Sequence, residues 1–472
     1  MLSNFLTTSF KAELKYEPTI DQYQLFEKLS VFFIDKNPDS AFLINGYAGT
    51  GKTSSISAVV RSLKTIQIKT VLLAPTGRAA KVFSHYSGQM AFTIHKKIYR
   101  QRSSSDGLGN FVLDRNLNKD TFFIVDEASM ISDSSMENSI FGSGNLLGDL
   151  IEYVYSGTNC KLILIGDTAQ LPPVGFDLSP ALEAHTLNEF NLKVNEITLT
   201  QVVRQSLQSG ILQNATELRT QINNNIFSIK RPKFILNDED VFRISGENLI
   251  EEINNAYDKY GIENVIVVNR SNKRANKYNQ GIRNSILYRE SQISTGDLIM
   301  VVKNNYFWSE TVEEIDFIAN GDIAEIIKIF DYQELYGLKF ADIRIRMIDY
   351  NGIELDVKII LNTLEIETAS LPNEENKKLF LSIIEDYSEL TTKKQKYQKV
   401  KENPYFNALQ VKFSYAITCH KAQGGQWKIV FLDQGYVSDE MLNREYLRWM
   451  YTAFTRSIEK IYLVNFPDDY FE

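Results

Sequence analysis

The segment 46–53 constrains this chain of 472 residues more than any other. Its sequence, Gly-Tyr-Ala-Gly-Thr-Gly-Lys-Thr, is a complete G-x-x-x-x-G-K-[ST] phosphate loop, and it lies between the apolar run 41–44 and the helix-compatible stretch 54–64. Glycines let successive N–H groups point at phosphate oxygens, and the helix adds the positive end of its dipole. A chance glycine-rich turn is the alternative, but the strand, loop and helix order predicts an α/β domain that binds a nucleoside triphosphate.

The loop assigns roles to its residues. Lys52 is expected to reach the β and γ phosphates, and the Thr53 hydroxyl is expected to bind Mg²⁺. The expected nucleotide-binding residues of the loop are Gly46, Ala48, Gly49, Thr50, Gly51, Lys52 and Thr53. ATP and Mg²⁺ are therefore the expected nucleotide and metal.

A second feature favours hydrolysis over binding alone. The apolar run 122–125 ends in Asp126 and Glu127. Ligands of open α/β sheets lie at the carboxyl ends of strands, so both acids would arrive beside the phosphates. Asp126 is the expected partner of Mg²⁺, and Glu127 is the expected base that polarises water. A solvated strand end is the alternative.

Composition and charge narrow the class of protein. The chain is longer than one core, so two to four domains are expected, and 43% hydrophobic with 23% charged residues is ordinary for a globular protein. The net charge of −8 argues against a protein that binds polyanions over its whole surface. It does not argue against a local basic or polar channel, because the local field decides binding. Cys160 and Cys419 lie in apolar segments and suggest reduced core thiols. Without an apolar run of about 18 residues or a secretory signal, a cytoplasmic protein of bacterial or phage type is expected.

Apolar runs that alternate with helical stretches predict parallel sheets. The first series of runs ends near residue 199, and a second series comprises 265–268, 429–432 and 460–464. Between them, 293–361 is rich in short β-type runs, and the charged stretch 374–401 is expected to be helical. The segment 101–119 has a serine- and glycine-rich middle and is expected to be a hairpin, with a surface loop as the alternative.

Six further segments fall in the order of known helicase motifs. They are 74–80 (Ala-Pro-Thr-Gly-Arg-Ala-Ala), 93–95 (Thr-Ile-His), 126–129 (Asp-Glu-Ala-Ser), 164–173 (Leu-Ile-Gly-Asp-Thr-Ala-Gln-Leu-Pro-Pro), 418–424 (Thr-Cys-His-Lys-Ala-Gln-Gly) and 451–456 (Tyr-Thr-Ala-Phe-Thr-Arg). With the phosphate loop, this set resembles the superfamily 1 DNA helicases of the RecD/Dda type, the 5′ to 3′ group, over nearly the whole chain.

The resemblance implies two RecA-like α/β lobes with insertions. The expected division is lobe 1A at 1–95 and 120–198, an inserted hairpin 1B at 96–119, lobe 2A at 199–290 and 405–472, and an inserted domain 2B at 291–404. Domain 2B is expected to combine an all-β, SH3-like part with helices. Domain 1B corresponds in position to the strand-separating pin of the family; its tip has no bulky wedge, and Phe111 is the nearest candidate.

The resemblance also implies catalytic roles. Gln170 would sense the γ phosphate and couple it to the second lobe, as an amide can both donate and accept there; a core glutamine is the alternative. Arg204 and Arg456 would be arginine fingers, since a guanidinium suits phosphate oxygens; surface salt bridges are the alternative. Gln22 resembles the adenine-reading glutamine, with Gln24 close by as the alternative.

Hydroxyl, amide and imidazole groups, rather than a lysine stripe, are the expected contacts to a nucleic-acid strand. The residues in segments similar to the strand-contacting motifs are Thr76, Thr93, His95, Asn269, Thr418 and His420. Each could instead be a cap or turn residue. Aromatic residues such as Tyr306 and Trp308 could stack on bases or belong to the core.

The function expected from these residues and the resemblance is an ATP-dependent helicase that translocates on single-stranded DNA, 5′ to 3′ by resemblance, and separates duplex strands. The expected partners are single-stranded and tailed duplex DNA, with proteins of replication or repair, and the expected state is a monomer. A nucleotide switch without sustained turnover and a phosphotransferase are the alternatives. A switch needs neither Glu127 nor the two arginines, and a phosphotransferase leaves the second α/β lobe unexplained.

Overall fold

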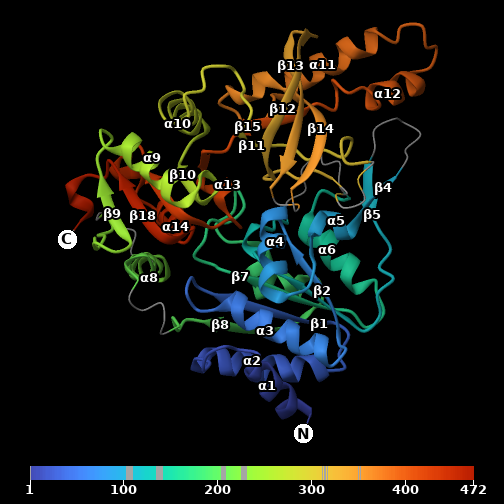
Figure 1. Cartoon of the computed structure of the whole chain (residues 1–472). Helices are drawn as coiled ribbons and strands as arrows, with labels where there is room; N and C mark the ends of the chain where they lie inside the picture. The colour runs from blue at the N-terminus through green and yellow to red at the C-terminus, as the bar shows by residue number, and fades with distance from the viewer. Residues whose placement is uncertain are drawn as a thin grey trace.

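The computed structural model describes residues 2–102, 110–133, 142–203, 209–224, 231–310, 312, 315, 317–348, 350 and 352–471, without the side chains of residues 101, 102 and 110. Within these ranges the chain forms two parallel sheets, a closed five-stranded barrel and a two-stranded hairpin (Figure 1). The α/β class and the β-rich insertion expected from the sequence are confirmed.

The first sheet carries the phosphate loop. Its strand order is β3-β2-β6-β7-β1-β8, and every neighbouring pair is parallel. Its strands are β1 (Ser40–Gly46), β2 (Lys69–Ala74), β3 (Ala91–Thr93), β6 (Thr121–Val125), β7 (Lys161–Gly166) and β8 (Lys193–Leu199). The helices around it are α1 (Leu2–Ala12), α2 (Ile20–Ile34), α3 (Lys52–Thr65), α4 (Gly77–Ser87), α5 (Ile94–Ile98), α6 (Leu146–Tyr155) and α7 (Ala184–Glu189).

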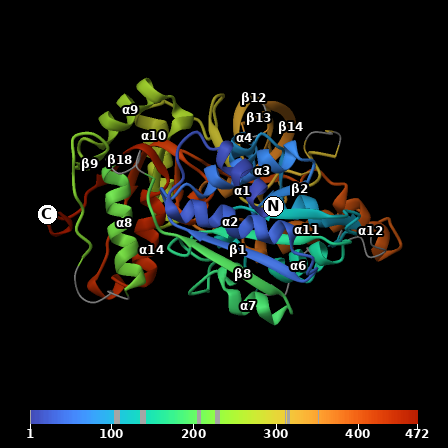
Figure 2. The same cartoon turned by 90° about the horizontal axis from the view of Figure 1, so that it is seen from below.

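Successive side chains of β1 point to opposite faces of this sheet, and helices cover both faces. Phe42 and Ile44 pack with residues of α1, α2 and α3, whereas Ala41 and Leu43 pack with residues of α6. Figure 2 shows α1 and α2 beside β1 and β8 from below. A strand that is covered on both sides reads as a continuous apolar run, which is why the sequence reveals it.

The second sheet is built from pieces that lie far apart in the sequence. Its order is β16-β10-β17-β18-β9, again with parallel neighbours. The strands are β9 (Val241–Ile244), β10 (Val265–Asn269), β16 (Ala416–Thr418), β17 (Trp427–Asp433) and β18 (Ser457–Val464). The helices are α8 (Gly210–Asn223), α9 (Leu249–Tyr260), α10 (Asn272–Ser285), α13 (Cys419–Ala422) and α14 (Arg444–Phe454).

The inserted domain is a closed barrel extended by two helices. Its strands are β11 (Leu298–Val301), β12 (Ile323–Leu335), β13 (Leu338–Met347), β14 (Ile353–Ile360) and β15 (Leu409–Phe413), and its helices are α11 (Asn373–Glu385) and α12 (Lys393–Lys401). Because β15 closes the barrel after both helices, the barrel extends past residue 404, where domain 2B was expected to end. Figure 1 shows the two helices reaching away from the sheets.

The expected hairpin is present as β4 (Tyr99–Arg102) paired antiparallel with β5 (Asn110–Leu113). Its serine-rich tip, 103–109, lies outside the described residues. Among the helices that the structure describes, none is both long and apolar enough to cross a membrane.

Candidate functional site

A cavity of about 600 Å³ opens where the two α/β lobes meet. The first lobe contributes the phosphate loop, Asp126, Glu127 and Gln170, and the second lobe contributes Arg456 with its neighbours. The structure therefore brings together residues that the sequence places more than four hundred positions apart.

The backbone of the phosphate loop takes the shape that glycine allows. Gly49 and Gly51 both have φ of +75°, in the left-handed region. Gly46 has another constraint: a Cβ at this position would lie 2.6 Å from Cγ of Lys52, so only glycine lets the lysine fold back over the loop. α3 begins at Lys52, so its free N-terminal N–H groups face the cavity as an anion site requires.

The Lys52 ammonium is held by the backbone of the loop itself. Its Nζ donates to the carbonyl oxygens of Gly46 and, at 3.1 Å, of Tyr47. It also lies 3.7 Å from Oδ2 of Asp167, which is buried. Carbonyl and carboxylate oxygens thus hold the cation where phosphate oxygens would replace them.

The two acids after β6 have different surroundings. Burial and the neighbouring charge of Glu127 raise the pKa of Asp126 to about 7, although the N–H of Glu127 donates to Asp126 Oδ1 at 2.9 Å. Glu127 has φ of +54°, an uncommon backbone conformation for a glutamate, which turns the chain sharply after the strand. Both side chains line the cavity, as the sequence predicted.

Gln170 is buried beside the same cavity. Only 6% of the residue is exposed, and its Oε1 has no hydrogen-bond partner among the described residues. A buried amide oxygen without a partner is costly, so this atom is available to a water molecule or a ligand.

Three side chains of the second lobe hold the segment that contains Gln170. Thr452 Oγ1 accepts from the N–H of Leu171 at 2.9 Å, and Gln423 Nε2 donates to the carbonyl of Leu171 at 2.6 Å. The Tyr451 hydroxyl donates to Asp167 Oδ2 at 2.6 Å. Sequence reasoning placed these side chains in motifs but assigned them no role, and the only signal was their position within segments 418–424 and 451–456.

Arg456 lines the cavity but is bound to its own lobe. Its three guanidinium nitrogens donate to the carbonyls of Thr452 and Gly425 and to the Thr455 hydroxyl, at 3.1 to 3.2 Å. Only 3% of Arg456 is exposed, so this residue does not form a surface salt bridge. Arg204, the other expected finger, lies outside the described residues.

Gln22 lies next to the phosphate loop and is hydrogen-bonded to its backbone. Its Nε2 donates to the carbonyl of Thr50 at 2.9 Å and to the Tyr16 hydroxyl at 3.2 Å, and its Oε1 accepts from the N–H of Thr19. Gln22 is fully buried, whereas Tyr16 lines the cavity. The role of Gln22 in reading adenine stays a prediction.

Several expected strand contacts are also helix caps. Thr76 caps α4 by accepting from Ala79 N–H, and Thr93 caps α5 by accepting from Lys96 N–H, both at 3.2 Å. Thr418 precedes α13 without a side-chain cap, and buried Asn269 keeps an Nδ2 without a partner among the described residues. Capping orients these hydroxyls but is compatible with a further contact.

The histidines of these motifs are held neutral by burial. Desolvation lowers the pKa of His95 to about 4, and it also lowers the pKa of His420. They can therefore offer hydrogen bonds but no positive charge near neutral pH. The adjacent Lys421 was missed by sequence reasoning: burial lowers its pKa to about 8, and its Nζ has no partner among the described residues.

Phe111 is a packed residue rather than a protruding wedge. It is 8% exposed, and its ring centroid lies 4.2 Å from that of Tyr306, which follows the first barrel strand. Tyr306 in turn packs on Phe317 at 4.9 Å. The hairpin is thus anchored to the barrel by aromatic contacts, and Tyr306 serves packing here, as does Trp308, whose Nε1 donates to the carbonyl of Asn407.

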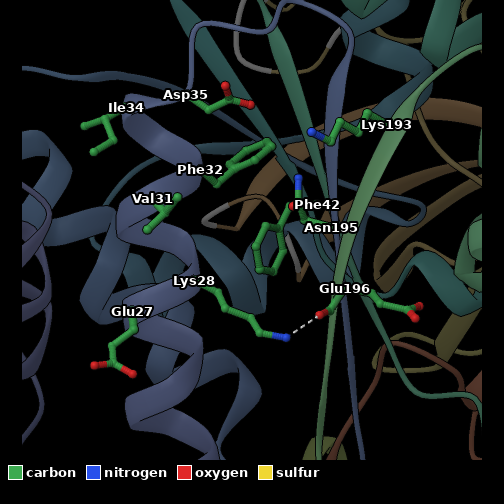
Figure 3. A pocket seen from close by; sticks show the side chains of 10 residues that line it. All are labelled: Glu27, Lys28, Val31, Phe32, Ile34, Asp35, Phe42, Lys193, Asn195 and Glu196. Carbon is green, nitrogen blue, oxygen red and sulfur yellow. Dashed lines mark hydrogen bonds between the residues drawn. The ribbon is translucent and has the colours of Figure 1, made fainter.

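A second cavity of about 590 Å³ lies between α2 and the edge strand β8 (Figure 3). Phe32, Phe42 and Val31 line it, and Lys28 Nζ donates to the carbonyl of Glu196 at 3.0 Å. It contains no residue of the phosphate loop, and the lysine protects part of the strand edge.

The residues of the cavity between the lobes fit a nucleoside triphosphate with Mg²⁺. Phosphates would be bound by the glycine-rich phosphate loop, by the ammonium of Lys52 and by the amide of Gln170, whose Oε1 has no partner among the described residues. Among the described residues no group of three or more His, Cys, Asp or Glu side chains gathers as a metal cage. A metal held chiefly by phosphates, water and the side chains of Thr53 and Asp126 agrees with this arrangement, because Mg²⁺ keeps several waters and few protein ligands.

Comparisons with known proteins agree with both lobes. Residues 31–231 match the family described as an AAA domain, and residues 413–464 match the family described as a UvrD-like helicase C-terminal domain. The first range contains the phosphate loop and Gln170, and the second contains Tyr451 and Arg456.

Individual relatives cover different parts of the chain. The ATP-dependent RecD2 DNA helicase of Deinococcus radiodurans is 30% identical over 37% of this chain and 21% of its own length. The ATP-dependent DNA helicase Pif1 of a Psychrobacter species is 22% identical over 84% of this chain and 63% of its own length. This chain thus spans less than two thirds of either relative. A crystal structure of a Bacteroides Pif1 helicase with ADP-AlF3 and ssDNA has a TM-score of 0.48 and 14% identity, covering 97% of this chain and 95% of that one.

Proposed function

We propose that this chain, which belongs to the superfamily 1 helicases of the RecD and Pif1 type, hydrolyses ATP to translocate 5′ to 3′ along single-stranded DNA and to separate duplex strands. The observation that carries the proposal is the cavity in which Lys52, Glu127 and Arg456 of two different lobes meet. A site completed by a second lobe can convert nucleotide turnover into lobe movement.

In the proposed reaction, Lys52 leaves the carbonyls of its own loop and binds the β and γ phosphates. Glu127 orients and polarises the attacking water. Gln170 bonds the γ phosphate through the amide that has a free oxygen in this structure, and Arg456 and Arg204 stabilise the charge that develops on the transferred group. Mg²⁺, with Thr53 and Asp126 near it, would neutralise phosphate charge.

Hydrolysis would be transmitted through the contacts around Gln170. The Leu171 backbone is bonded to Thr452 and Gln423 of the second lobe, so a shift of this segment on γ-phosphate release would reach that lobe directly. We infer that this contact lets the lobes close and open once in each cycle.

For DNA, we propose that the backbone of one strand crosses both lobes over Thr76, Thr93 and Asn269, with Lys421 adding a charge. Thr76 of the first lobe and Gly424 of the second already meet, since a Cβ on Gly424 would lie 3.1 Å from Thr76 Oγ1. His95, Thr418 and His420 complete the set. Such contacts hold phosphates without reading sequence, as a motor that must pass every base requires.

We further propose a cytoplasmic monomer that works beside proteins of DNA replication or repair. Both cysteines are free and buried, as suits a reducing compartment.

The test of this function is ATP turnover with and without oligo(dT). We expect oligo(dT) to stimulate ATP turnover by the wild-type protein, and blunt duplex DNA to leave the turnover unchanged. Lys52→Ala should lose about 10²-fold or more of the turnover, because no neighbouring ammonium replaces the phosphate contact. A wild-type turnover that ignores single-stranded DNA would favour a nucleotide switch or a phosphotransferase instead.

A further inference from the structure

A groove on the outer side of the second lobe is not part of the ATP or strand contacts described above. It lies between α9 and α10, which run side by side in Figures 1 and 2, and encloses about 410 Å³. Its floor is aliphatic: Leu249, Ile253 and Ile282 are buried, and Ile250 remains 39% exposed. An open aliphatic hollow of this size accommodates one or two apolar side chains of a partner.

The rim of the groove carries charge of one sign. Lys273, Arg274 and Lys277 line it, and no acidic residue does within the part of the chain that the structure describes, although the chain as a whole has a net charge of −8. The acidic residues of the neighbouring helix α9, Glu251, Glu252 and Asp258, lie outside the lining.

The three basic groups are not equally engaged. Arg274 is paired with buried Asp433, and Lys273 pairs at 2.9 Å with Glu367 through two side chains that are each 62% exposed. Lys277 is exposed and makes no ion pair within the described part of the chain. One free ammonium and one weakly paired ammonium therefore flank an apolar hollow.

We propose that this groove docks an acidic peptide segment of a partner protein, with an apolar or aromatic side chain inserted between α9 and α10 and carboxylates on Lys277 and Lys273. Burial of the inserted side chain supplies the anchor of the contact, and the charges around it select the partner. A nucleic-acid strand fits less well: among the described residues, the one ring in the lining belongs to Tyr278, whose hydroxyl is bound to Asp433, and an aliphatic floor offers bases no stacking platform.

Gly281 offers a variant that fills the groove without harming the fold. It lines the hollow from α10, and a Cβ added there would meet nothing within 4 Å. Gly281→Leu should therefore project into the hollow, and because leucine favours a helix more than glycine does, the melting temperature should stay the same or rise.

The test measures fluorescence anisotropy of a labelled short peptide made of Asp and Glu with one Phe and one Leu three positions apart, at about 0.1 M salt. The wild-type protein should bind it, Gly281→Leu should lose binding, and Lys277→Glu should weaken it about tenfold because an attraction becomes a repulsion. Lys259→Glu makes the same charge change on α9 outside the lining and should bind as the wild type does.

Two controls separate the groove from general electrostatics. A peptide with Ser in place of Phe and Leu should bind at least about tenfold more weakly, because the anchor is removed. Labelled oligo(dT) should bind Gly281→Leu and Lys277→Glu as tightly as the wild type. Equal peptide binding by the wild type and Gly281→Leu would overturn the proposal, as would a loss of oligo(dT) binding equal to that of the peptide, which would assign the groove to DNA.

Discussion

The Tyr451 hydroxyl in α14 donates a hydrogen bond of 2.6 Å to Asp167 Oδ2, which follows β7 in the other lobe. The same hydroxyl accepts a bond of 2.8 Å from the N–H of Ala48 in the phosphate loop. Both Tyr451 and Asp167 are 1% exposed, and burial beside Asp167 raises the pKa of Tyr451 far above its usual value. One neutral phenol of the second lobe thus touches both the loop and the carboxylate that faces Lys52.

The first prediction follows from this contact. Tyr451→Phe keeps the ring in the core but removes the hydroxyl that bonds both Asp167 Oδ2 and the Ala48 N–H. The free energy of unfolding should therefore fall by about 1–3 kcal/mol. Stimulation of ATP turnover by oligo(dT) should fall more than turnover without DNA, because the lobes lose a direct link at the loop. Denaturant unfolding and paired turnover assays measure both effects.

Tyr446→Phe is the matched control for that prediction. Tyr446 lies in the same helix and is also 1% exposed, but its hydroxyl bonds with Gln434 and Tyr470 of its own lobe. Tyr446→Phe should lower the free energy of unfolding about as much as Tyr451→Phe does. Its ATP turnover should still be stimulated by oligo(dT) as in the wild type. If both variants lost stimulation equally, the effect would be structural and not a property of the contact between lobes.

The second prediction separates binding from chemistry at Glu127. Glu127→Gln should bind ATP with Mg²⁺ about as tightly as the wild type but hydrolyse it about 10²-fold or more slowly, since an amide cannot act as the base. A nucleotide titration beside a turnover assay gives both values. Unimpaired turnover would place the base on another residue.

The third prediction concerns pH and rests on Asp126, whose pKa is raised to about 7. Above pH 7 the carboxylate is mostly ionised and can attract Mg²⁺, whereas below pH 7 a proton competes with the metal. The affinity for ATP with Mg²⁺ should therefore weaken about tenfold between pH 8 and pH 6. Asp126→Asn should bind more weakly at pH 8 and show a flat profile; a wild-type profile as flat as that of the variant would remove Asp126 from the metal site.

The fourth prediction concerns the hairpin. Phe111→Ala removes a ring that packs 4.2 Å from Tyr306, so the hairpin should lose its anchor on the barrel. Duplex separation should fall several-fold, while turnover stimulated by oligo(dT) stays within about twofold of the wild type, because the nucleotide site is untouched. Phe111→Leu keeps much of the packing and should fall in between. Equal loss of both activities would indicate general damage to the first lobe.

Local sequence patterns revealed the chemistry of the first lobe well. The phosphate loop, Asp126 and Glu127 lie at the ends of apolar strands that are buried on both faces, and such runs are visible in one dimension. The short strands β3, β9 and β16 were not foreseen, because a few residues at a sheet edge leave no clear period. The last barrel strand, β15, follows two helices, so the barrel continues beyond residue 404, the end of domain 2B in the division that the resemblance implied.

Contacts between distant segments could not be predicted from the same patterns. Nothing in the sequence records that the hydroxyl of Tyr451 meets the N–H of Ala48, or that Phe111 is buried against Tyr306 instead of projecting toward a duplex. The amide of Gln22 is likewise bonded to the Thr50 carbonyl, a partner that depends on how two helices pack around the loop. Such pairings are decided by packing in three dimensions.

The central claim, a motor that separates strands while moving 5′ to 3′, is tested most directly by unwinding of a labelled duplex with ATP and Mg²⁺. Three substrates of one sequence are compared: a duplex with a 5′ single-stranded tail, one with a 3′ tail and a blunt duplex, each with Lys52→Ala as the negative control. The 5′-tailed duplex alone should be separated, and the affinity for its tail should fall as salt rises. Separation of the 3′-tailed duplex in preference to the 5′-tailed one, or separation by Lys52→Ala, would contradict it.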